Sequence, residues 1–224
     1  MPVSAEPKLS SGVYLTEFGV ALTDYFIALV CAGFVWSLRK REVPSGTLSW
    51  TWIIFFGSLV IASVAGGTVH GFYLDESTLG FRILWPVTLL AIGVTATSAW
   101  ILSGFFISGP TRTFKWVVFA GAALTLYAAA VLFYAQTFVL VILYYVPALL
   151  LLLVGSILKY SRTKRAHYLS ITWGVCLSFC AAAIQQIEIG IHPVYFNHNS
   201  TYHLVQVFGL WAFFQGTKTL TDSQ

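Results

Sequence analysis

The sequence predicts an all-α membrane protein, a bundle of seven transmembrane helices with its N-terminus outside and its C-terminus in the cytoplasm. Its 224 residues are 58% hydrophobic and only 9% charged, and the mean hydropathy is +0.80, whereas soluble domains carry about 25% charged residues. The apolar residues fall into seven long runs, and the basic residues gather beside every second connection between them. Lipid is therefore the expected solvent.

Each run is long enough for one span, because about 20 apolar residues cross the roughly 30 Å hydrocarbon core. The expected helices cover residues 13–38, 50–72, 79–105, 114–134, 138–158, 167–187 and 202–218. Residues 1–12 are then a short external tail, 13–218 one transmembrane domain, and 219–224 a short cytoplasmic tail. Pro147 is expected to kink the fifth helix, because proline removes one backbone donor and clashes with the preceding turn.

The basic residues set the orientation. With seven spans, all twelve Lys and Arg residues except Lys8 and Arg82 fall on one side, and the positive-inside rule makes that side cytoplasmic. The net charge of +4 therefore reflects loop bias and not a basic binding surface, so we expect no nucleic acid partner.

Histidines from two helices define the candidate site. His70 lies near the outer end of the second helix and His203 begins the seventh, so both lie at similar depth on the outer side. Zn²⁺ suits imidazole ligands, and a catalytic zinc takes three protein ligands and one open position. His198 is the nearest candidate for the third ligand, and the further candidates are His192, Glu188 and Asp24.

Three other polar residues are candidates for catalysis. Asp24 lies well inside the first helix, where a carboxylate must pair, stay protonated or face a wet cavity. Asp24 or Glu188 would serve as general base. Ser63 shares a face of the second helix with His70 and is a candidate to support an oxyanion.

The seven helices, the external N-terminus and the two histidines resemble the CREST superfamily, which groups alkaline ceramidases with progestin and adiponectin receptors. The resemblance implies a zinc ion that activates water to cleave a lipid amide. Only His70 and His203 match the family's motifs residue for residue. Gly66 stands where the family has a serine, and the HxxxH pair of the last helix appears here as Asn199 and His203, or as His203 and Val207.

Three functions remain open from the sequence. The first is a zinc-dependent membrane hydrolase acting on a lipid amide or ester. The second is a non-enzymatic seven-helix protein, either a sensor of a lipid or small ligand, or a subunit that associates with a membrane-protein partner or with further copies of itself. The third is a proton or ion conduit that uses Asp24 as its intramembrane relay.

Overall fold

The computed structural model describes residues 17–40, 46–192 and 195–221. In these ranges the chain forms seven α-helices and one short 3-10 helix, η1, and no extended strand. The elements are α1 (Phe18–Lys40), α2 (Thr47–Phe72), α3 (Leu79–Ser108), η1 (Pro110–Arg112), α4 (Thr113–Phe133), α5 (Phe138–Thr163), α6 (Ala166–Gln186) and α7 (His198–Thr221).

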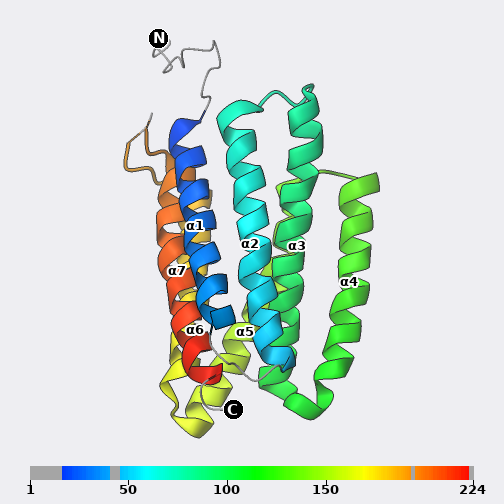
Figure 1. Cartoon of the computed structure of the whole chain (residues 1–224), viewed down its shortest axis with the longest axis vertical. Helices are drawn as coiled ribbons and strands as arrows, with labels where there is room; N and C mark the ends of the chain where they lie inside the picture. The colour runs from blue at the N-terminus through cyan, green and yellow to red at the C-terminus, as the bar shows by residue number, and fades with distance from the viewer. Residues whose placement is uncertain (1–16, 41–45, 193–194, 222–224) are drawn as a thin grey trace.

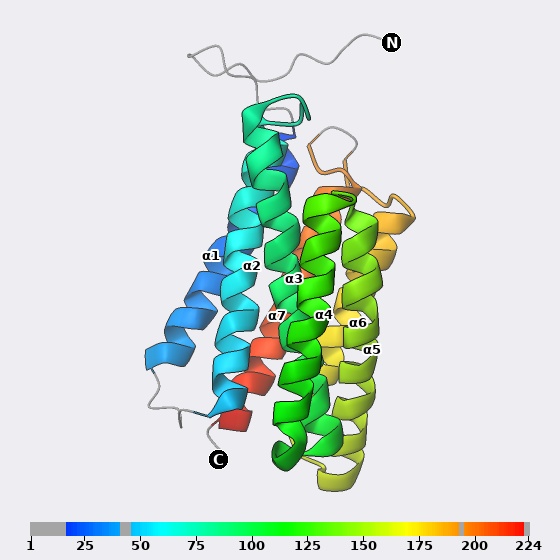
Figure 2. The same ribbon diagram turned by 90° about the vertical axis from the view of Figure 1, so that its right-hand side faces the viewer.

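The helices stand side by side in one bundle, and each runs antiparallel to the next in the chain (Figure 1). We call the end at which α1 and α7 begin the upper end, as Figure 1 is drawn. Consecutive helices pack against each other, α3 also packs against α5, and α1 meets α7. Helix α4 lies at the edge of the bundle, mainly against α3. In Figure 2 the side of the bundle that carries α4 faces the viewer.

Six helices of the described ranges, α1 to α6, are long and apolar enough to cross a membrane. Large apolar side chains cover the outside of the bundle: Leu29, Phe114, Leu126 and Phe133 are 73%, 76%, 74% and 87% exposed. A surface with this much exposed hydrocarbon is not suited to water. The chain thus has the helix lengths and the surface of a multi-pass membrane protein.

The predicted helices are confirmed, with ends that differ by a few residues. The largest shift within the described ranges is at the lower end of the fifth helix, which continues to Thr163. The last helix begins one turn earlier than expected, at His198, and continues to Thr221. The first predicted helix began at residue 13, but residues 13–16, like the expected external tail, lie outside the described ranges.

Side chains of α3 satisfy backbone carbonyls of α5 around Pro147. The indole N–H of Trp100 donates to the carbonyl of Tyr144 (3.3 Å), and the hydroxyl of Ser103 donates to that of Ala148 (3.1 Å). These two bonds tie α3 to the α5 backbone on either side of Pro147, whose missing N–H leaves the Leu143 carbonyl without its helical donor. Helix α5 continues through Pro147, and the predicted kink stays a prediction.

Aromatic side chains fill the lower half of the bundle between α1, α2 and α7. Phe34 stacks on Phe214 with ring centroids 4.2 Å apart, and it meets Phe56 edge-on at 5.3 Å. Trp52 and Phe213 pack beside them and are fully buried. Because Phe34 is ten residues beyond Asp24 on α1, this cluster lies about 15 Å below that carboxylate.

Candidate functional site

The buried contact between α1 and α7 is the centre of the site. Thr23 and Asp24 lie two turns into α1, and His203 lies in the second turn of α7. The hydroxyl of Thr23 is 2.9 Å from His203 Nδ1, and Asp24 Oδ1 is 3.4 Å from His203 Nε2. The three residues are 3%, 7% and 4% exposed. Both ring nitrogens of His203 thus face α1.

The Thr23 hydroxyl lies against both the α1 backbone and a ring nitrogen of His203. Its oxygen lies 2.9 Å from the carbonyl of Gly19 and 3.0 Å from that of Val20, and a hydroxyl has a single proton to donate. When that proton goes to the α1 backbone, Thr23 accepts from the Nδ1–H of His203. The Nε2 of a neutral ring then has a bare lone pair directed at the Asp24 carboxylate.

Two acceptors that face each other need a positive charge between them. An ionised Asp24 and a neutral His203 would repel across the 3.4 Å gap, and an unpaired buried charge is costly. A proton shared by the two groups, or a cation bound by both, removes the conflict. The pair can therefore share one proton, and a bound cation would remove the same conflict.

Glycines of α2 make room for the Asp24 side chain. A Cβ on Gly67 would lie 2.8 Å from the Cβ of Asp24 and 3.3 Å from the Ala21 carbonyl, and a Cβ on Gly66 would lie 3.8 Å from Asp24 Oδ2. Small residues at such a contact let two helices approach closely. Gly66 thus stands beside the carboxylate that α1 supplies.

A second carboxylate–histidine pair lies above the first. Glu17 Oε2 is 2.5 Å from His70 Nδ1, and the Glu17 backbone N–H donates to the His70 carbonyl (3.1 Å). Both side chains are about one-quarter exposed, at 28% and 25%. Glu17 is seven residues before Asp24, so the two pairs lie about 10 Å apart along α1.

The Asp24–His203 pair fits a zinc ion as two of its ligands. On a tetrahedral zinc with bonds of about 2.0–2.1 Å, two ligand atoms are about 3.4 Å apart, which matches the Nε2–Oδ1 distance. In the part of the chain that the structure describes, however, no group of three His, Cys, Asp or Glu side chains is placed to hold a metal ion.

The other predicted site residues occupy separate positions. Ser63 is buried on α2, one turn below Gly67. His198 is the first residue of α7 and is half-buried. Glu188 is exposed just beyond α6, with a left-handed φ of 57°. The roles predicted for Ser63, His198 and Glu188 remain predictions.

Several other polar residues near the site form hydrogen bonds with α6 or within the loop before α7. Gln185 on α6 donates to Asn199 (3.3 Å), and Gln206 donates to Ser178 on α6 (3.1 Å). His192 Nδ1 accepts from the Tyr195 N–H (3.2 Å). These contacts hold the start of α7 against α6 and hold the loop before it.

Asp75, the aspartate nearest to His70 in sequence, is exposed in the turn between α2 and α3. Hydrogen bonds from Ser77 hold the pKa of Asp75 below its usual value, and the Ser77 backbone N–H is 2.9 Å from its Oδ1. This carboxylate organises a turn that also presents Thr78 as the N-cap of α3.

Glu17 and Thr23 were not singled out from the sequence. Glu17 is seven residues before Asp24, which places the two carboxylates near one face of a helix, and this spacing could have identified it. Thr23 carries no such signal, because threonines in apolar helices commonly bond their own backbone.

The fold and the site define a class: an all-helical protein of membrane character with a buried acidic–histidine centre near one end of its bundle. Residues 20–222 match the model of a family described as "Family of unknown function (DUF6962)", and the chain belongs to that family. No curated protein and no solved structure matches the chain.

Proposed function

We propose that the chain is a metal-dependent membrane hydrolase acting on a lipid amide or ester, with Asp24 and His203 as protein ligands of Zn²⁺. The supporting observation is that His203 Nε2 and Asp24 Oδ1 face each other at 3.4 Å across a gap that needs a positive charge. In this proposal all seven helices span the membrane, and the upper end is extracytoplasmic, as the basic residues at the other end indicate.

Each neighbouring side chain has a definite task in the proposed site. Thr23 holds the His203 ring with Nδ1 protonated, so that Nε2 is the atom available to a metal. When bound, zinc would lower the pKa of a coordinated water toward about 7 and polarise a carbonyl. The Glu17 carboxylate orients His70, as an acidic residue orients the imidazole of a catalytic triad, and His70 is placed to move protons at the upper edge.

Metal content is the measurement that tests the proposal. The purified full chain, supplied with Zn²⁺ and then freed of excess, is expected to retain about one zinc per molecule. Asp24→Asn and His203→Gln are expected to weaken retention by about tenfold or more, because each removes a ligand and leaves a single one. His167→Gln, at the lower end of α6, is the control and keeps the metal.

The hydrolytic part needs its own assay. Cleavage of a long-chain acyl amide or ester in detergent or liposomes is expected to disappear with a chelator and to return with Zn²⁺. The proposal would be wrong if the wild-type protein held no stoichiometric metal while its helicity and its gel-filtration profile showed that it was folded.

A non-enzymatic sensor is the second candidate, and one observation favours it. A catalytic zinc takes three protein ligands, whereas the described residues offer no group of three. In that case Asp24 and His203 share a proton, and the pair is a polar anchor for a lipid or small ligand. Ligand binding by metal-free protein would support this reading over the hydrolase.

A further inference from the structure

The two carboxylate oxygens of Asp24 have different surroundings. Oδ1 faces His203 Nε2 at 3.4 Å, whereas Oδ2 is 3.8 Å from the point where a Cβ on Gly66 would stand. Within the described ranges, no group donates a hydrogen bond to Oδ2. Asp24 is only 7% exposed, and a buried polar atom without a hydrogen bond is costly. Oδ2 therefore needs a donor that the described residues do not supply.

Thr88 on α3 presents a second acceptor to the same place. Its Oγ1 is also 3.8 Å from the point of a Gly66 Cβ, and its Cγ2 is 3.4 Å from that point. The Thr88 hydroxyl lies 2.9 Å from the Leu84 carbonyl and donates its single proton there, so it can only accept a further hydrogen bond. Two buried acceptors, on α1 and on α3, thus border one space beside Gly66 of α2.

A water molecule has the size and the two protons that this space requires. Hydrogen bonds of about 2.8 Å to each oxygen let one water join two acceptors that are up to about 5.6 Å apart. Buried waters typically bond polar groups that lack protein partners. The Asp24 side chain keeps 10% of its surface exposed, so a molecule as small as water can touch it.

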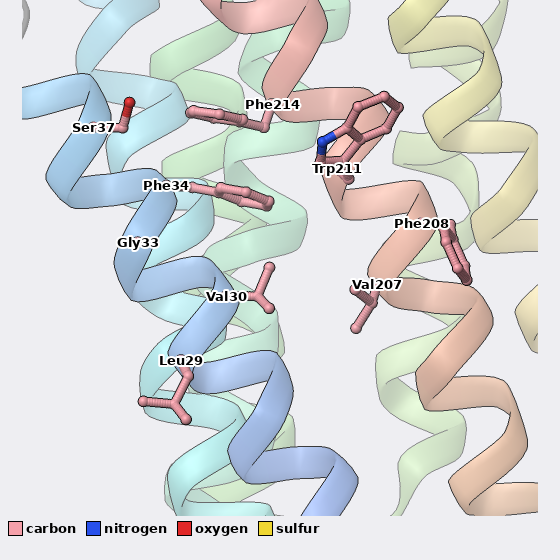
Figure 3. Close-up of a pocket in the computed structure, with 9 residues that line it drawn as sticks. All are labelled: Leu29, Val30, Gly33, Phe34, Ser37, Val207, Phe208, Trp211 and Phe214. Carbon is pink, nitrogen blue, oxygen red and sulfur yellow. The ribbon is translucent and has the colours of Figure 1, made fainter.

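The space beside Gly66 is separate from the groove that lies lower in the bundle between α1 and α7. That groove has a volume of about 660 Å³, and Figure 3 shows it with Phe34 and Phe214 facing each other. Its lining on α1 is centred on Gly33, which is nine residues, or about two and a half turns, beyond Asp24 and therefore on the opposite face of the helix. Asp24 faces α2 and not this groove.

We propose that a water molecule beside Gly66 joins Asp24 Oδ2 to Thr88 Oγ1, and that Thr88 is thereby a positioning residue of the site. The water donates one proton to each oxygen and holds the carboxylate with Oδ1 toward His203. Gly66 leaves the room for it. The inference deepens the proposed function, because Asp24 is the metal ligand there, but the water is expected whether the pair holds a zinc ion or shares a proton.

Gly66 supplies a direct test, because alanine fills the space without forcing the helices apart. The contacts of a Cβ at this position, 3.4–3.8 Å, are ordinary, whereas a Cβ on Gly67 would lie 2.8 Å from the Asp24 Cβ. Gly66→Ala is therefore expected to fold and to displace the water. Gly66→Ser brings its own hydroxyl and is expected to replace the water as the donor to Oδ2. Gly57→Ala on the same helix, where a Cβ meets no atom within 4 Å, is the control.

Thr88 is tested in the same way by two substitutions. Thr88→Val keeps the shape of the side chain and removes the acceptor, whereas Thr88→Ser keeps the hydroxyl. In protein that binds zinc, Gly66→Ala and Thr88→Val are expected to lower the zinc affinity by about 10–100-fold, as the loss of an outer-shell partner does. Gly66→Ser and Thr88→Ser are expected to keep most of the affinity.

Two measurements on the purified full chain in lipid nanodiscs do not depend on zinc. A structure at a resolution that shows ordered waters is expected to place one water within about 2.5–3.0 Å of both oxygens, and Gly66→Ala is expected to lack it. The infrared bands of the Asp24 carboxyl group, identified by their loss in Asp24→Asn, are expected to shift in Gly66→Ala and in Thr88→Val. They are expected to stay unchanged in Gly57→Ala.

Failure of the inference is distinguishable from failure of the proposed function. A wild-type protein that shows the water and binds no zinc supports the inference and contradicts the hydrolase. A protein that binds zinc but has an ion at this place, or a direct bond between Asp24 and Thr88, contradicts the inference and leaves the metal site. Identical carboxyl bands in Gly66→Ala and Gly57→Ala would also overturn the role of the water.

Discussion

At the scale of single residues, the chemistry of the site depends on the hydrogen-bond partners of His203. His203 has one ring nitrogen against the Thr23 hydroxyl and the other against the Asp24 carboxylate. Thr23 is itself committed to its own helix backbone. Where Thr23 donates to its own helix, His203 carries its proton on Nδ1 and directs Nε2 at the Asp24 carboxylate.

Thr23→Val tests this dependence, because valine keeps the shape and removes the hydroxyl. The Nδ1 of His203 would lose its partner, and zinc affinity is expected to fall by about 10–100-fold, as it does when outer-shell partners of metal ligands are removed. Thr23→Ser is expected to preserve most of the affinity. Competition with a chromogenic chelator measures the change.

The matched control is Thr95→Val on α3. Thr95 is fully buried and bonds Ser58 across a helix contact, so its loss costs stability without touching the site. Zinc affinity equal to wild type in Thr23→Val would show that Thr23 does not hold the ring.

At the scale of elements, the sequence predicts the extent of each helix well, but it does not predict which helices pack against each other. Apolar runs fix the helices because about 20 apolar residues must span the hydrocarbon core, and His70 and His203 were placed at one end of the bundle from this pattern alone. The partners Asp24 and Glu17 depend on α1 packing between α2 and α7. Three apolar helices of similar length do not encode that arrangement in their periodicity. Asp24 is therefore one of several candidate partners of His203 in the sequence, and the Glu17–His70 contact emerges only from the folded chain.

The contact between α1 and α2 depends on Gly67, and Gly67→Ala is expected to disrupt it. The added Cβ would lie 2.8 Å from the Asp24 Cβ, so one helix must move. Overpacking of this kind typically costs about 1–3 kcal/mol. Thermal unfolding in detergent, followed by loss of helicity, is expected to show a lower midpoint and a weakened site.

Gly57→Ala on the same helix is the control. A Cβ on Gly57 meets nothing within 4 Å, and alanine is favoured over glycine inside a helix by up to about 1 kcal/mol. It is expected to be neutral or slightly stabilising. A Gly67→Ala variant as stable as Gly57→Ala would contradict the close α1–α2 contact.

At the scale of the whole molecule, polar, aromatic and basic groups follow one another from the upper end to the lower. The acidic–histidine pairs lie near the upper end, and the Phe34, Phe56 and Phe214 cluster lies below them. Basic residues such as Lys40, Arg112 and Lys159 lie near the lower end. The ring cluster beneath Asp24 places apolar side chains between α1, α2 and α7, where a proton conduit would need polar groups. This arrangement favours a site that is served from the upper end.

The orientation of the whole bundle is open to measurement by cysteine labelling. In a chain whose Cys31, Cys176 and Cys180 are replaced by alanine, Ser77→Cys is expected to react with a membrane-impermeant maleimide on intact cells. Ser77 lies in the exposed turn at the upper end. Thr163→Cys, at the lower end of α5, is expected to react only after the membrane is permeabilised.

Ser223→Cys decides whether α7 crosses the membrane, since Ser223 follows α7 in the sequence. Helix α7 is less apolar than the others, but it buries Leu210 and Phe213 in the bundle and runs parallel to α1 (Figure 1). If α7 spans with its neighbours, as we propose, Ser223→Cys is expected to behave like Thr163→Cys. Labelling of Ser223→Cys on intact cells would mean that α7 does not cross. The Asp24–His203 contact, which needs α7 inside the bundle, could not then form in the membrane.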